Sequence, residues 1–100
     1  MSDTLGSLID KIITVDMKLW SAQDRLYRIR NMDFEQFRKE FSTEDGLLEL
    51  FNYYKNAVDL NLQRNDLIDE IDSKIIEVVD AIIKGESLDK FIQRKHKIYA

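Results

Sequence analysis

The apolar residues near the N-terminus recur at alternating intervals of three and four, and the whole chain contains no proline. This spacing places side chains on one stripe of an α-helix, and it predicts a helix over residues 5–29. The stripe consists of Leu5, Leu8, Ile12, Val15, Leu19, Ala22, Leu26 and Ile29. A second row lies beside it and includes two polar residues: Ile9, Ile13, Asp16, Trp20, Gln23 and Tyr27. A face this broad can contact two partners at once.

A longer helix is predicted over residues 44–84. Ser42 and Thr43 provide a start signal, and no strong helix breaker follows until Gly85. The same spacing gives the stripe Leu47, Leu50, Tyr54, Ala57, Asn61, Arg64, Ile68, Ile71, Ile75, Val78 and Ile82. At 1.5 Å per residue this helix extends about 60 Å, whereas the first helix extends only about 40 Å. We therefore expect a kink near residues 61–65 or a second subunit that covers the remainder, and we favour the second subunit.

Two short helices complete the predicted architecture. The capping-box spacing of Asp33 and Gln36 predicts a connecting helix within residues 31–43. We expect this helix to cover the core with one face that carries Phe34, Phe37 and Phe41. Gly85 followed by Ser87 predicts the end of the long helix and the start of a short C-terminal helix.

The predicted fold class is all-α, with residues 1–100 forming a single helical domain. The expected architecture is an antiparallel helical hairpin or bundle with one very long second helix, a short connecting helix and a short C-terminal helix. A two-helix hairpin buries little surface, and symmetric homodimers are the commonest oligomers. We therefore expect dimerisation to complete the fold.

The composition argues against several classes of protein. The chain has no cysteine, which excludes disulfides and thiolate zinc sites and favours the cytoplasm. Its longest uncharged stretch is the six residues from Thr4 to Ile9, far below the ~20 apolar residues that span a bilayer. A signal-peptide pattern is also absent from the N-terminus. A formal net charge of −4 argues against a general nucleic-acid binder, which needs a basic face.

Two segments resemble small helical domains of unknown function from bacteria and their phages. The first is a Gly-x-Leu-Ile-Asp-Lys start followed by Lys-Leu-Trp and Gln-Asp, within residues 5–24. The second is an Arg-x-x-Leu-Ile-x-x-Ile-Asp segment within residues 63–72. Related domains are often encoded beside glycosyltransferases. The resemblance covers about a third of the chain. It implies a paired-helix domain that serves glycan or nucleotide-sugar metabolism, and it supplies no catalytic residues.

The most unusual feature is a polar group, Asn61, Arg64 and Asn65, on the expected inward side of the long helix. In an antiparallel pair with Leu26 near Asn61, the side chains of Gln23 and Asp24 would lie close to Arg64. This arrangement predicts an Arg–carboxylate network inside the bundle. One hypothesis is that this cluster fixes helix register or oligomeric state. A second is an anion-binding site at Arg64 with the candidate ligand-binding residues Asp16, Trp20, Gln23, Asn61, Arg64 and Asn65. Local solvent exposure of the polar residues is the third.

The sequence offers weak signals for an enzyme. The segment Glu77-Val78-Val79-Asp80 resembles one carboxylate motif of all-helical nucleotide pyrophosphohydrolases, but the first helix lacks the matching Glu-Glu. Residues 62–82 resemble the opening helix of helical chorismate mutases, although Arg64 alone could bind a substrate. His96 has no partner at metal-ligand spacing. We assign no catalytic residue, metal ligand or cofactor. Our leading hypothesis is a non-catalytic, homo-oligomeric interaction module that can also bind another protein.

Overall fold

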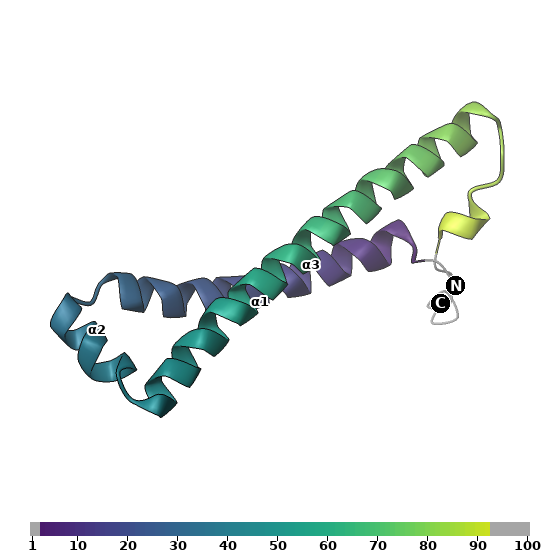
Figure 1. Cartoon of the computed structure of the whole chain (residues 1–100). Coiled ribbons are helices and arrows are strands. Elements are labelled where there is room, and N and C mark those ends of the chain that lie inside the picture. Colours follow the sequence, from purple (N-terminus) through teal and green to yellow (C-terminus); the bar gives the residue numbers. More distant parts are fainter. Residues whose placement is uncertain (1–2, 93–100) are drawn as a thin grey trace, which may run out of the picture. The chain divides into compact units, whose positions relative to one another are not determined.

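The computed structural model describes residues 3–92, and over that range it contains helices and no strands (Figure 1). The elements are α1 (Leu5–Arg30), α2 (Phe34–Phe41), the 40-residue α3 (Glu44–Ile83) and the 3₁₀ turn η1 (Asp89–Phe91). The long α3 packs against α1. The predicted all-helical class is confirmed, and so is one very long helix joined to the first by a short connecting helix.

The predicted C-terminal helix is wrong over the described residues. The structure has only the η1 turn there, because Ile92 adopts an extended conformation with φ −117° and ψ 135°. Ser87 accepts a hydrogen bond from the backbone N–H of Asp89 but does not start an α-helix. Residues 93–100, over which the predicted helix would continue, lie outside the described range.

The chain divides into two compact units, and α1 and α3 each contribute to both. Unit 1 comprises Met1–Thr14 and Asn65–Ala100, so its described part pairs the start of α1 with the second half of α3 and η1. Unit 2 comprises Val15–Arg64, in which the rest of α1 meets α2 and the first half of α3. Over the described residues, neither long helix is apolar enough to cross a membrane.

Side-chain caps fix where the helices begin. Thr4 Oγ1 accepts the N–H of Ser7 at the start of α1, and Thr43 Oγ1 accepts the N–H of Gly46 at the start of α3. The predicted capping box of α2 is present in full, because Asp33 Oδ1 accepts from the Gln36 backbone and Gln36 Oε1 accepts from the Asp33 backbone. These contacts satisfy N–H groups that have no partner within the first helical turn.

Gly85 ends α3 as predicted. Its φ of +70° lies in the left-handed region, which glycine adopts without steric cost. The N–H of Gly85 donates to the carbonyl of Ile82, and the N–H of Glu86 donates to the carbonyl of Ala81. This pair of hydrogen bonds is the Schellman arrangement.

The stripe predicted on α1 is its buried face. Leu8, Val15 and Ala22 are buried, and most of the remaining stripe is half-buried. The second row on α1 is exposed along its whole length. The sequence therefore identified the face that α1 turns toward α3.

The stripe predicted on α3 is half correct. Five predicted positions are half-buried: Leu50, Ala57, Arg64, Ile71 and Val78. The other predicted positions are rotated outward, except for half-buried Ile68, and their places are taken by Gly46, Tyr53, Leu60, Leu67, Lys74 and Ala81. Glycine and alanine allow two helices to approach closely, while the long stems of Arg64 and Lys74 cover apolar surface and keep their charges at the edge.

Helix α2 contacts the start of α3 through its last turn. Phe41 is buried and its ring lies 5.1 Å from that of half-buried Phe37. Phe34 is 71% exposed, so the prediction that all three phenylalanines cover the core is wrong for this residue. Gly46 is buried against this turn, and a Cβ at Gly46 would overlap the carbonyl oxygen of Glu40. This requirement for glycine was not predicted from the sequence.

Candidate interaction surface

An ion pair between α1 and α3 lies within the predicted polar cluster. Arg64 Nε donates a hydrogen bond to Asp16 Oδ1 over 2.8 Å. The Arg64 side chain retains 40% of its accessible surface and the Asp16 side chain 48%. No charged residue is buried among those that the structure describes. The expectation of a buried Arg–carboxylate network is therefore wrong, and this pair lies at the surface.

The register of the two helices differs from the predicted one by one heptad. The sequence analysis placed Gln23 and Asp24 near Arg64, whereas the structure pairs Arg64 with Asp16. Farther along unit 2, the guanidinium of Arg25 lies 5.2 Å from the centre of the Tyr53 ring. A slip of seven residues keeps the same side chains on the same faces, so periodicity does not distinguish the two registers.

The other candidate residues do not enclose a binding site. Trp20 is 69% exposed, and Gln23, Asn61 and Asn65 are also exposed. Asn61, in unit 2, and Asn65, in unit 1, share one face of α3, because residues four apart on a helix lie on the same side. That face does not turn toward α1. The polar residues Asn61 and Asn65, which interrupt the apolar pattern of α3, therefore lie in an exposed row.

An exposed apolar surface lies on unit 2. It contains Trp20 and Tyr27 from α1 together with Leu47, Phe51, Tyr54 and Val58 from α3, all of which are at least 40% exposed. In an antiparallel helix pair, positions one residue after the buried stripe lie on the same side of both helices. These side chains therefore share one side of the pair. We call the exposed rows one residue after the buried stripes the outer rows.

Unit 1 has outer rows of its own, which consist of aliphatic residues. Ile9 and Ile13 belong to α1, and Ile75, Val79 and Ile82 belong to α3. Each of these five side chains is more than 40% exposed. Single exposed apolar residues are ordinary, but a contiguous row indicates an interaction site.

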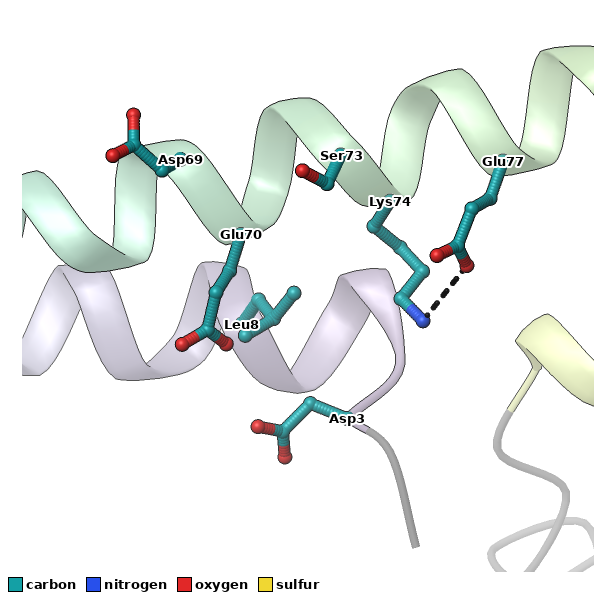
Figure 2. Close-up of a pocket in the computed structure, with 7 residues that line it drawn as sticks. All are labelled: Asp3, Leu8, Asp69, Glu70, Ser73, Lys74 and Glu77. Atoms are coloured by element: carbon teal, nitrogen blue, oxygen red, sulfur yellow. Dashed lines mark hydrogen bonds and ion pairs between the residues drawn. The ribbon is translucent and has the colours of Figure 1, made fainter.

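A separate acidic hollow of about 280 Å³ lies on unit 1 (Figure 2). Asp3, Asp69, Glu70 and Glu77 contribute carboxylates, and Lys74 Nζ pairs with Glu77 Oε2 at 3.2 Å. Across the described part of the chain, no three residues among His, Cys, Asp and Glu are placed to bind a metal ion. This hollow therefore does not have the ligand set of a metal site.

A polar cluster in unit 2 involves all three of its helices, because Arg28 of α1 interacts with Glu40 of α2 and with Tyr53 of α3. Arg28 Nη2 pairs with Glu40 Oε1 at 3.0 Å, and the Tyr53 hydroxyl donates to Glu49. The hydrogen bond to Glu49 raises the pKa of Tyr53 because it stabilises the protonated phenol. Hydrogen bonding to Glu40 likewise raises the pKa of Arg28.

Comparison with known proteins identified no relative of this chain. No family model, curated protein or solved structure matches this chain. The resemblance to bacterial and phage domains stays a prediction.

Proposed function

We propose that this chain is a helical interaction module that associates with itself and has no catalytic activity of its own. The observation that supports the proposal most strongly is the exposure of the outer rows on α1 and α3. Apolar burial is the main driving force of association. Burying these rows against a second helical pair would form a four-helix arrangement around a continuous apolar layer.

The hypothesis of an anion-binding site at Arg64 receives no comparable support. Its guanidinium already donates to the Asp16 carboxylate through Nε, and that carboxylate offsets the positive charge that would attract an anion. Trp20 points to the outer rows, where its exposed ring suits a protein interface, as tryptophan is enriched at such sites.

Sedimentation equilibrium at micromolar concentration tests the proposal. We expect a mass of twice the chain mass, with monomers appearing on dilution. Trp20 is the only tryptophan, so its fluorescence should shift to shorter wavelength as association removes it from water. A well-folded monomer throughout the micromolar range, with a helical circular dichroism spectrum, would overturn the proposal.

A further inference from the structure

The outer rows of unit 2 are complementary to a second copy of themselves. We infer that two copies of this chain pair through these rows about a two-fold axis parallel to the helices, so that α1 of each copy packs on α3 of the other. This inference rests on the proposed self-association and adds its surface, direction and register. Every residue that it uses lies in unit 2, Val15–Arg64.

Unit 2 can approach a copy of itself because its charges nearly cancel. Residues 15–64 contain eight Lys and Arg and nine Asp and Glu. By contrast, the described part of unit 1, residues 3–14 and 65–92, contains four Lys and Arg and ten Asp and Glu. A large net charge of one sign opposes the association of identical surfaces. The charge balance therefore favours unit 2 as the place where two copies meet.

Two contacts within unit 2 show which residues of α1 and α3 lie level with each other. Arg64 Nε donates to Asp16 Oδ1 over 2.8 Å, and the Arg25 guanidinium lies 5.2 Å from the centre of the Tyr53 ring. The helices are therefore antiparallel, because α1 advances from residue 16 to residue 25 while α3 returns from residue 64 to residue 53. A two-fold axis parallel to the helices moves no residue along them, so the same levels hold between the two copies.

Two apolar layers follow from this register. Trp20 of one copy lies level with Val58 of the second copy, and Tyr27 lies level with Phe51 of the second copy. All four side chains are exposed in the single chain, by between 40% and 69%. An indole against an aliphatic side chain and a pair of aromatic rings both bury apolar surface, and aromatic residues are enriched in the cores of interfaces. These layers supply the apolar contact of the dimer.

The polar residues of the outer rows also meet suitable partners in this register. Gln23 lies level with Tyr54 of the second copy, and an amide and a phenol hydroxyl can each donate and accept a hydrogen bond. Asp16 lies level with Asn61 of the second copy, whose amide N–H can donate to a carboxylate. All four side chains are exposed. Neither layer places like charges together.

The charges at the ends of the helices favour this direction of the axis. The last turn of α1 carries Arg28 and Arg30, and the first turn of α3 carries Glu44 and Asp45. Arg28 already pairs with Glu40 in its own chain, but Arg30 makes no ion pair within the described part of the chain. The parallel axis brings Arg30 beside the acidic first turn of α3 of the second copy. A perpendicular axis would stack like helices on each other and would not create this contact.

Cysteine cross-linking in the full chain tests the surface and the direction, because the natural sequence contains no cysteine. Tyr27→Cys and Phe51→Cys chains are prepared separately, mixed so that subunits exchange, and treated with a short bismaleimide. We expect covalent dimers in the mixture and little product from either chain alone, because the parallel axis places like helices diagonally opposite each other. Trp20→Cys mixed with Val58→Cys tests a second layer and should give the same result.

Ser21→Cys mixed with Asn56→Cys is the matched control. Both residues are exposed, and they lie level with each other in the register of Asp16 and Arg64. They are one residue before the buried stripes, on the opposite side of the helix pair from the outer rows. This mixture should give no product.

Each alternative arrangement gives a different result. Efficient product from Tyr27→Cys alone or Phe51→Cys alone would show that like helices stack, and would overturn the direction of the axis. Product in the control mixture alone would place the interface on the opposite side. A dimer by sedimentation with no product in any mixture would reject this surface while leaving self-association intact. A folded monomer by sedimentation would instead reject the proposed function itself.

Arg30→Glu and Glu44→Arg provide an independent test. Each chain alone should form a weaker dimer, with Kd raised about two- to fivefold, because like charges then meet at both copies of the contact. A mixture of the two chains should form a heterodimer with Kd close to that of the natural chain, since each reversed side chain meets one of opposite charge. A mixture that associates no more tightly than either chain alone would show that Arg30 and Glu44 do not meet.

Discussion

Arg64 Nε and Asp16 Oδ1 lie 2.8 Å apart and join α3 to α1 across 48 residues of sequence. The pair shows which residues of the two helices lie level with each other in unit 2. Its side chains are nearly half exposed, so water screens the attraction, and pairs of this kind contribute about 0–1 kcal/mol. The register must therefore depend mainly on the packing of Leu60, Ala22 and their neighbours rather than on the charges.

Arg64→Leu should raise the free energy of unfolding by up to about 1 kcal/mol. Arg64 occupies a half-buried position in the stripe that faces α1, and leucine would bury more apolar surface there. Urea denaturation at one fixed protein concentration measures the change. Asp16→Asn is the companion variant and should change stability by less than about 1 kcal/mol. A loss above 1 kcal/mol in Arg64→Leu would show that the ion pair is a major determinant of the fold.

Gly46→Ala should destabilise the chain by about 1–3 kcal/mol, because the added Cβ would overlap the backbone of α2 at Glu40. Gly6→Ala is the matched control. Gly6 is an exposed helical glycine whose Cβ would meet only Thr4 Oγ1 at 4.0 Å, and alanine there should stabilise by roughly 0.5–1 kcal/mol. Thermal unfolding followed by circular dichroism compares the two. Equal responses would contradict the close approach of α2 to α3.

Asp33→Ala should lower the free energy of unfolding by about 0.5–2 kcal/mol, because the capping box of α2 loses an acceptor for the Gln36 N–H. Asp33→Ser should recover most of that stability, since a serine hydroxyl can accept the same hydrogen bond. Chemical denaturation measures both variants. If serine were no better than alanine, the contribution of Asp33 would not arise from capping.

The pKa of Asp3 should lie below its ordinary value of 3.8, because Lys11 Nζ donates a hydrogen bond to its carboxylate at 2.8 Å. The folded state favours the charged form of the Asp3 carboxyl group. Its contribution to the stability of the fold is therefore present above the ordinary pKa of 3.8 and is lost as the pH falls through the lowered pKa of the folded state. Carboxyl titration by NMR measures this pKa. Lys11→Gln should raise it toward 3.8 and Lys11→Arg should keep it low; an unchanged value in Lys11→Gln would exclude Lys11 as the cause.

The local elements of this protein were predictable because their signals are carried by neighbouring residues. The capping box at Asp33 and the glycine at residue 85 act within one helical turn, and the structure confirms both. The alternating three-four spacing on α1 identified its buried face correctly. By contrast, Gly46 could not be interpreted from local sequence, because its neighbour is the backbone of another helix.

The candidate residues were predicted with the right chemistry but the wrong surroundings. Asn61 and Asn65 interrupt an apolar row, as the sequence indicated, but that row is exposed and does not face α1. Two overlapping rows on α3 both have helical spacing. The more apolar of these two rows was predicted to be buried. In the structure, Tyr53 and Lys74 of the other row are half-buried, and Ile75 of the predicted row is exposed.

The sequence by itself determined the helical class, the ends of the helices and the buried face of α1, because backbone hydrogen bonding, capping and side-chain periodicity act over a few residues. Only the tertiary structure decided which row of α3 meets α1 and which heptad register joins Arg64 to Asp16. The two possible rows of α3 have nearly the same periodicity, and so do the two possible heptad registers. They differ in how side chains of particular volume fit across two helices, and that fit depends on residues far apart in the chain.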